Sequence, residues 1–271
     1  MLSRVIFTLA LFLSSPVFAN QNGIGGELLL GAEAFLSYDE LRQLIVRGDV
    51  NVIMGGDSHL NVIEYDPGEV VVTQLLGGVV DLSPTPGFRV VSPTVVVRSN
   101  ERFKDLFQIS VRDQSSLVAK ELESRSLGVD IKTKGSVMIE GVMNLNHLNV
   151  VESSEVELYW VDSHNLDINV EQGDVVIAGR TSFLTMRGLD SANIDAAGLI
   201  AKRAWVSGVE SARISVFPTN ELFAYTKENA VIDVKQRPNV YAPVNQAPSA
   251  IVLNYVEMEK RASAALKKPV Q

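Results

Sequence analysis

Histidines and aspartates are the residues that could support catalysis or metal binding in this chain. The histidines are His59, His147 and His164. No two of them have the spacing of a zinc-binding pair. The sequence contains no cysteine, which excludes thiol catalysis and cysteine-ligated metals.

Asp162, Asp167 and Asp174 surround His164 in the sequence. Paired carboxylates on one face of a protein could cleave glycosides or polyuronates. The alternative is that these residues occupy solvated turns, where Asp, Asn and His are common. We favour the turns, and the sequence therefore predicts a non-enzymatic protein with no catalytic residues, metal or cofactor.

A repeat in the sequence predicts the structural elements that would position these residues. A polar residue followed by an apolar-x-apolar pattern recurs every 17 to 20 residues. The copies start at Ser116, Ser136, Glu155, Asp174, Ser191, Ser211, Asn229 and Ser249. Alternation within each copy indicates a short β-strand, and the near-constant period is typical of a β-solenoid.

A second apolar pair follows the start of each copy by about eleven residues. These pairs are Leu127/Val129, Leu148/Val150, Leu166/Ile168, Leu184/Met186, Leu222/Ala224 and Val240/Ala242. In the copy at Ser191, Leu199 or Ala201 fills this role poorly. Stacked copies would bury these residues against their equivalents at roughly 4.8 Å.

We therefore predict an all-β fold, a right-handed parallel β-helix with rungs of about 19 residues. Right-handed crossovers dominate parallel sheets, which sets the predicted hand. The alternative is an antiparallel β-sandwich, which has no reason to keep one spacing over so many copies. The predicted column of stacked isoleucines contains Ile177, Ile194 and Ile214.

The first 19 residues read as a secretory signal peptide. Arg4 precedes an apolar run from Val5 to Leu13, and Val17-Phe18-Ala19 ends in small residues before Asn20. Nine apolar residues are too few to span a bilayer. Cleavage removes Arg4 alone among the charged residues, so the formal net charge moves from −8 to −9. That charge argues against nucleic acid as a partner.

The rest of the chain is expected to form one domain between two terminal segments. Residues 20–43 form a flexible segment, 44–252 the β-helix domain and 253–271 a tail, with a short helix or a frayed end over 257–268. No later stretch is long and apolar enough for a transmembrane helix.

The first half of the domain is less regular than the second. Expected strands there include Leu44 to Val46, although a short helix after Ser37 competes with that strand. The other expected strands are Val50 to Val52, Leu60 to Val62, Glu69 to Gln74 and Gly87 to Val97.

The second half resembles a known family. The segments that carry the resemblance are 199–204, 206–208, 212–214, 221–224, 230–234 and 238–240, together with the turns Gly135-Ser136 and Gly173-Asp174. They are similar to the autotransporter-adhesin head domain, called the GIN domain. The resemblance implies a right-handed β-helix over roughly 44–252, suggests adhesion and brings no catalytic residues.

Four outward positions near the C-terminal end are predicted to bind a partner. Phe223 and Tyr241 take outward places in second strands, and Val231 and Ile251 do so in first strands. Grouped apolar side chains and open strand edges need a cover in water, from the tail or from a partner.

Two tryptophans give a further candidate for binding. Trp160 and Trp205, with Tyr159, are expected at rung edges, where they could stack on sugars or cover the core.

Together these features predict an exported structural or protein-interaction subunit of the bacterial cell envelope. It would lie in the periplasm or at the outer membrane and contact envelope proteins, as in a secretion or envelope assembly. The alternatives are an adhesin-like binding module and, from another class, a carbohydrate-active enzyme.

Overall fold

The computed structural model describes residues 34–37, 40–59, 61–87, 92–152, 154–246 and 250–254, all within one compact unit that spans 31–271. The expected signal peptide and the expected helix at 257–268 lie outside the described residues. Among the described residues, no helix has the length and apolar character needed to cross a membrane.

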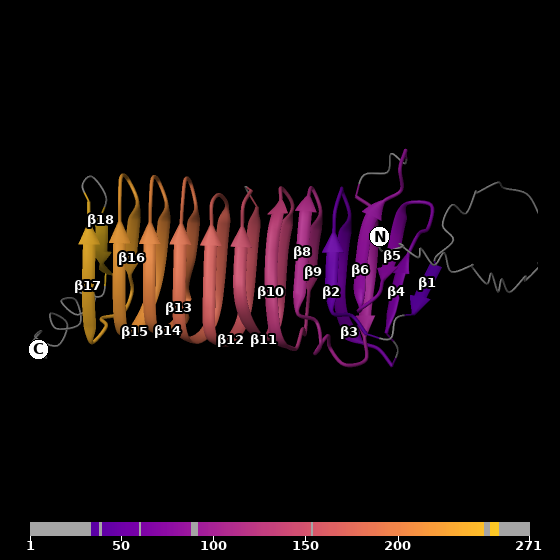
Figure 1. Cartoon of the computed structure of the whole chain (residues 1–271), viewed down its shortest axis with the longest axis horizontal. Helices are drawn as coiled ribbons and strands as arrows, with labels where there is room; N and C mark the ends of the chain where they lie inside the picture. Colours follow the sequence, from indigo (N-terminus) through magenta and orange to yellow (C-terminus); the bar gives the residue numbers. More distant parts are fainter. Residues whose placement is uncertain are drawn as a thin grey trace, which may run out of the picture. The chain divides into compact units, whose positions relative to one another are not determined.

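Eighteen strands of the described residues form one sheet that coils on itself (Figure 1). They are β1 (Ala34–Ser37), β2 (Gln43–Val46), β3 (Asn51–Asp57), β4 (Val62–Tyr65), β5 (Val70–Leu75), β6 (Val79–Pro84), β7 (Thr94–Ser99), β8 (Gln108–Asp113), β9 (Ser116–Ala119), β10 (Ser124–Thr133), β11 (Ser136–Val150), β12 (Glu155–Val170), β13 (Asp174–Gly188), β14 (Asn193–Gly208), β15 (Arg213–Thr226), β16 (Val231–Val234), β17 (Val240–Asn245) and β18 (Ala250–Leu253).

Each rung of the coil contributes to two faces. The first face holds β7, β3, β9, the N-terminal halves of β11–β15, and then β16 and β18. The second face holds β6, β2, β8, β10, the C-terminal halves of β11–β15, and then β17. All these neighbours pair in parallel, so the predicted parallel β-helix is confirmed.

Glycines allow the chain to bend between the two faces. Gly179 has a φ of 142° where β13 turns from the first face to the second. A Cβ at Gly179 would lie 2.1 Å from the carbonyl oxygen of Val161 in the preceding rung. Gly141 plays the same part in β11, with a φ of 150° and the oxygen of Leu122 at 2.0 Å. Any larger side chain at these bends would push neighbouring rungs apart.

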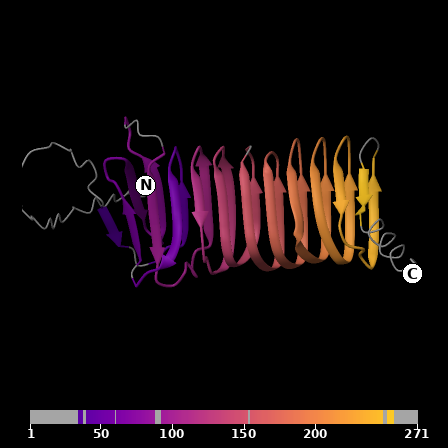
Figure 2. The ribbon, with the colours of Figure 1, turned by 180° about the vertical axis from the view of Figure 1, so that it is seen from behind.

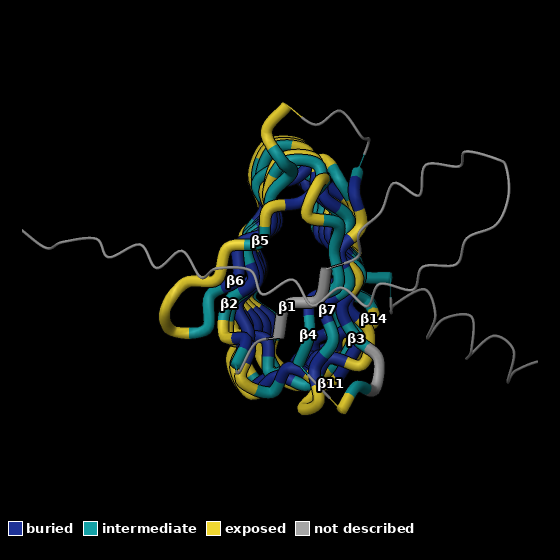
Figure 3. Tube along the Cα trace, turned by 90° about the vertical axis from the view of Figure 1, so that its right-hand side faces the viewer, coloured by how far each residue is buried: buried dark blue, intermediate teal, exposed yellow. Residues whose placement is uncertain are grey.

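The core fills the space between the faces. Figure 3 shows the buried residues on the inside of the coil and the exposed ones around it. One column runs through Val156, Val175, Ile194, Ile214 and Ile232, all buried. The predicted column was therefore right for Ile194 and Ile214. It was wrong for Ile177, which pairs with Leu158 in the next column.

The late copies begin later than the sequence pattern predicted. Asp174 aligns with Asn193, then with Arg213, Val231 and Ala250, and the steps remain 18 to 20 residues. The predicted starts were one or two residues too early. In the first three of these copies the cause is a third inward apolar residue, because Ala192, Ala212 and Ala230 are also buried. Alternation alone cannot choose which two of three such residues to align.

The copy that starts at Ser191, which was expected to be irregular, has a regular second strand. Ala204 aligns with Leu184, and Val206 aligns with Met186. Both Ala204 and Val206 are buried, so they take the place that Leu199 or Ala201 was expected to fill.

The first rungs do not stack in the order of the sequence. Strand β2 lies between β6 and β8, and β3 lies between β7 and β9. Figure 1 shows the indigo β2 between β6 and β8, and Figure 2 shows the same stack from behind. The expected strand at Leu44 to Val46 is confirmed as β2, whereas β6 was not predicted.

Antiparallel strands finish this end of the coil. Strand β5 pairs with β6, and β4 pairs with β7 and β1. An ion pair also links the residue after β2 to β6, since Arg47 Nε donates a hydrogen bond to Asp81 Oδ1 at 2.9 Å. Antiparallel strands that end a parallel stack hinder further parallel addition at this edge.

Candidate binding surface

The polar residues near His164 do not converge on one point. Arg180 donates two hydrogen bonds to Asp162, at 2.9 and 2.6 Å, and Asp174 accepts one from Asn193 at 2.8 Å. The ring of His164 instead packs edge-on against Phe183, with centroids 5.3 Å apart. Asp162 and Asp174 thus each bond to the next rung. The expected placement in turns was wrong for Asp162, His164 and Asp167, which lie within β12.

The pKa of Asp162 reflects the same ion pair. The hydrogen bonds from the Arg180 guanidinium lower the pKa of this carboxyl, and partial desolvation opposes them only in part. Asp162 is therefore ionised at neutral pH and cannot supply a proton as a general acid would. Nor does any group of three or more His, Cys, Asp or Glu in the described part of the chain have a geometry that could hold a metal ion.

The four predicted partner-binding residues do not form one surface, because two point outward on opposite faces and two pack against the core. Phe223 points outward from the second face, and Val231 points outward from the first. Tyr241 aligns with the buried Leu222, and Ile251 aligns with the buried Ile232. Both pack against the core, so their predicted outward orientation was wrong.

A slip of one residue in β17 explains the error at Tyr241. Phe223 aligns with Ala242, not with Tyr241. Because successive side chains alternate between the faces of a sheet, a one-residue slip exchanges inside and outside. Val240, expected inside, is accordingly 51% exposed.

Phe223 belongs to an aromatic surface on the second face of the late rungs. We use this name for Trp205, Phe223, Tyr225 and Val244. Trp205 is 63% exposed and Phe223 40% exposed, and the two are in direct register on β14 and β15. Their rings meet edge to face, with centroids 5.6 Å apart and an interplanar angle of 63°. That geometry is one that aromatic pairs prefer.

A groove of about 370 Å³ lies along this surface. One wall is the outward column of Trp205 and Phe223, and the other is the column of Ser207, Tyr225 and Val244. The buried residues between the two columns form its floor: Met186, Val206 and Ala224. The groove crosses neighbouring rungs, so its shape is set by the stacking of the coil and not by a loop.

Charged residues border the aromatic surface on one side. Arg203 lies over the ring of Phe183, with its guanidinium carbon 5.4 Å from the ring centroid. The same side chain pairs with Glu221, with Nε 3.2 Å from Oε1. Arg203 is thus held between an aromatic ring and a carboxylate, and it gives the apolar groove a polar rim.

The position of Trp205 beside Phe223 was not predicted from the sequence. Both tryptophans were expected at rung edges, and Trp160 does lie at the bend between the faces of β12, with a φ of 67°. Trp205 was missed because its copy had been aligned incorrectly. The signal was present in Gly188 and Gly208, which end equivalent strands and align in the structure.

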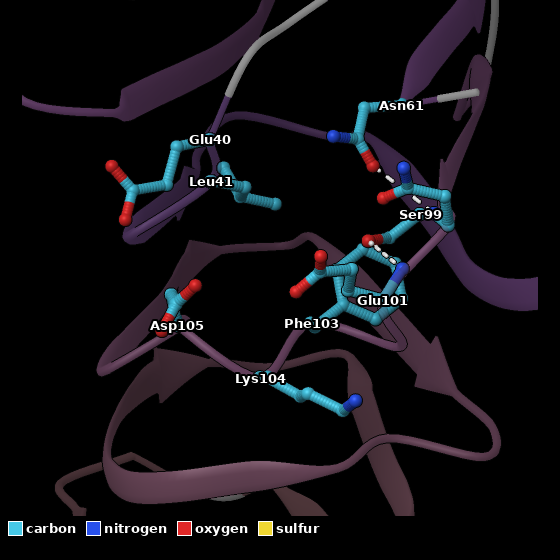
Figure 4. A pocket seen from close by; sticks show the side chains of 9 residues that line it. Glu40, Leu41, Asn61, Ser99, Glu101, Phe103, Lys104 and Asp105 are labelled. Atoms are coloured by element: carbon cyan, nitrogen blue, oxygen red, sulfur yellow. Dashed lines mark hydrogen bonds between the residues drawn. The ribbon is translucent and has the colours of Figure 1, made fainter.

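A second pocket, of about 380 Å³, lies at the other end of the coil (Figure 4). The figure shows Glu40 and Asp105 on one side and Asn61, Ser99 and Glu101 across from them. Its polar side chains interact with residues of the loops around it. Ser99 Oγ accepts a hydrogen bond from the backbone of Glu101 at 3.2 Å, and Glu40 pairs with Arg42 at 2.9 Å. The aromatic surface is therefore the better candidate for binding.

The fold and the surface define a parallel β-helix with a lateral aromatic groove. A family model described as "Putative auto-transporter adhesin, head GIN domain" matches residues 49–238. The chain belongs to this GIN head-domain family, and the resemblance stated from the sequence is confirmed.

Solved bacterial structures share the fold. A putative adhesin from Bacteroides fragilis is 16% identical, with a TM-score of 0.55, and the match covers 82% of this chain and 95% of that one. A putative lipid binding protein from Parabacteroides distasonis is 16% identical, with a TM-score of 0.63 and coverages of 82% and 96%. A putative adhesin from Parabacteroides merdae is 14% identical, with a TM-score of 0.61 and coverages of 82% and 95%. Among curated proteins, none matches the chain.

Proposed function

We propose that this chain is an exported, non-enzymatic binding protein of the bacterial cell envelope, and that its aromatic surface holds a partner protein. Membership of the GIN head-domain family and the adhesin-like names of similar structures support a binding role. The expected signal peptide supports export to the periplasm or the outer membrane. The observation that carries the proposal is the groove beside Trp205 and Phe223.

The composition of this surface favours a protein as the partner. Tryptophan, tyrosine and arginine are the residues that most often dominate protein interfaces, and Trp205, Tyr225 and Arg203 are grouped here. Apolar surface that a partner removes from water contributes about 25 cal/mol per Å² to the free energy of association. The Arg203–Glu221 pair supplies the charged rim that surrounds the apolar centre of such interfaces.

The non-enzymatic part rests on the dispersed carboxylates. Asp162 is tied to Arg180 and Asp174 to Asn193, whereas glycoside cleavage needs two carboxyl groups on either side of one bond.

A glycan is the second candidate ligand, as in an adhesin-like module. The observation that favours it is Trp205, which is 63% exposed, with Ser207 two residues further along β14 and the exposed Arg187 in register with Ser207. An aromatic ring can stack on a sugar while neighbouring polar groups bond to its hydroxyls.

The test uses a double variant that combines Trp205→Ala and Phe223→Ala. It is compared with the single variant Trp160→Ala. Trp160 is a matched control because it is 60% exposed but lies away from the groove. Each purified protein is used to capture partners from the native envelope, and bound proteins and sugars are identified by mass spectrometry. Calorimetry then measures the affinity of each variant for the recovered molecule.

We expect the double variant to stay folded and to lose at least tenfold in affinity, the scale of one aromatic anchor. The Trp160→Ala variant should bind like the unchanged protein. Recovery of a glycan with the same loss would favour the second candidate. Equal binding by all three proteins would show that the aromatic surface is not the binding site.

A further inference from the structure

The groove of the aromatic surface runs across the strands that form its floor. It extends from Thr185 in β13, over β14 and β15, to Val244 in β17. These strands follow one another in the stack of Figure 1. With neighbouring strands about 4.8 Å apart, the groove is about 14 Å long. A linear occupant would therefore lie along the axis of the coil.

The backbone beneath the groove offers no edge to a peptide. Strand β14 pairs with β13 on one side and with β15 on the other, and β15 pairs with β14 and β17. A peptide cannot join these strands as an added strand, because that mode of binding needs an unpaired edge. Side chains alone must hold the occupant.

The width of the groove limits what can enter it. Its walls stand two residues apart along a strand, as Trp205 and Ser207 do, which is about 7 Å. An α-helix with its side chains is about 10–12 Å across, so it cannot lie between the walls. A polyproline II helix is a thinner chain, because it rises about 3.1 Å per residue and an α-helix only about 1.5 Å.

The repeat of a polyproline II helix also matches the repeat of the coil. Three of its residues advance about 9.3 Å, and two rungs advance about 9.6 Å. Every third residue would therefore meet an equivalent place two rungs further on. Thr185 and Phe223 are two such places in one outward column, and Trp205 and Ala242 are another two.

The side chains of the walls suit such a peptide. A polyproline II helix has no internal hydrogen bonds, so its carbonyl groups accept them from outside. Trp205 Nε1, Ser207 Oγ and Tyr225 Oη can each donate one. Within the described part of the chain, none of these three atoms makes a hydrogen bond. Proline brings an apolar ring and no N–H, so it leaves no donor unpaired in an apolar groove.

The charges beside the groove favour an acidic residue at one end of the peptide. Arg187 begins the column of Ser207 at β13, is exposed, and aligns with the uncharged Asn169 on its other side. Among the residues that the structure describes, no carboxylate pairs with Arg187. Arg203, in contrast, is already paired with Glu221.

We propose that the groove binds a proline-rich segment of the partner protein in the polyproline II conformation, with an acidic residue of that segment against Arg187. This inference rests on the proposed function, because it names the part of the partner that the aromatic surface holds. Aromatic-lined grooves are the usual receptors for such segments, whose conformation costs little entropy to fix.

Synthetic peptides added to the purified chain test the inference. The first peptide holds six prolines, about 19 Å in length, between two glutamates. The second has glutamines in place of the glutamates, and the third has glycines and serines in place of the prolines. Calorimetry measures the affinities, and NMR follows the indole N–H of each tryptophan. Trp160 serves as the internal control, because it is 60% exposed but lies away from the groove.

We expect the first peptide to bind at least tenfold more tightly than the third, because a flexible chain loses more entropy on binding. The Trp205 resonance should shift, and the Trp160 resonance should not. Arg187→Gln should weaken binding of the first peptide about threefold, the scale of an exposed ion pair, and leave the second unchanged. Arg213→Gln is the matched control, because Arg213 is exposed on the first face, and it should change neither affinity.

Equal affinities for the first and third peptides, or no shift at Trp205, would overturn the inference. An equal effect of Arg187→Gln on the first and second peptides would refute the position of the acidic residue. If a neutral oligosaccharide shifts the Trp205 resonance and the proline peptides do not, the groove holds a glycan instead.

The proposed function is judged separately, by capture from the envelope. If the variant with Trp205→Ala and Phe223→Ala loses a captured protein while no proline peptide binds the unchanged chain, the proposed function stands and this inference fails. If the proline peptides bind but the captured protein is retained by that variant, the proposed function fails.

Discussion

Replacing Ile194 with alanine tests the stacking of the coil most directly. Ile194 is 1% exposed and lies between Val175 and Ile214 in one inward column. Truncating a buried isoleucine to alanine removes its apolar contacts and leaves a cavity, which costs about 2–5 kcal/mol. The rungs above and below are fixed by backbone hydrogen bonds, so the cavity can collapse little. We expect a cost of about 3 kcal/mol.

Urea denaturation followed by far-UV circular dichroism measures this cost. With an m-value of about 2 kcal/mol per molar urea, the unfolding midpoint should fall by about 1.5 M. The matched control is Ile200→Ala in the same strand, because Ile200 is 50% exposed. The control should stay within about 0.5 kcal/mol of the unchanged protein.

A stronger change at the same position is Ile194→Asp. It places an unpaired charge in the core, so the variant should lose its β-sheet circular dichroism signal or be degraded during expression. The assigned register would be refuted if Ile194→Ala and Ile200→Ala had equal midpoints, or if Ile194→Asp were as stable as the unchanged chain.

Three further predictions follow from other features. Gly179→Ala should destabilise the protein by about 1–3 kcal/mol more than Gly77→Ala, which has a positive φ but no neighbour within 4 Å; equal urea midpoints would contradict the assigned bend. Arg180→Gln should raise the pKa of Asp162, measured by NMR, because it removes the hydrogen bonds that lower it. The accompanying loss of stability should be present above the ordinary Asp pKa of 3.8 and fade as pH falls through the lowered value, and an unchanged pKa would show that the pair does not form in solution. The purified chain should bind no zinc tightly and cleave no polysaccharide, since His164 and its neighbouring aspartates do not converge; glycan cleavage abolished by Asp167→Asn or Asp174→Asn would refute this.

The period and the class of fold could be read from the sequence because their causes are local. The copies starting at Ser136, Glu155 and Asp174 were placed in the register that the structure has. In these rungs the position two residues before the first inward residue holds Gly135, Ser154 or Gly173, so no third apolar residue competes for the inside. The family resemblance rests on the same regular rungs.

The late register was decided only by tertiary packing. Where three inward residues follow one another, as at Ala192, Ile194 and Ala196, the pattern fits two alignments equally well. Contacts with the neighbouring rung select one of them. That choice brings Trp205 beside Phe223, and the separate one-residue slip in β17 turns Tyr241 inward, so most of the aromatic surface was not predictable from single copies.

The sequence by itself determined that this chain stacks short strands into a parallel coil of about 19 residues per rung, because alternation and spacing act within each copy. Tertiary structure alone decided the order of the first rungs, where β2 lies between β6 and β8, and the grouping of aromatic residues on the second face. Both depend on pairings between strands that are distant in the chain. The free energy of those pairings comes from packing against neighbours, which the pattern of a single segment does not contain.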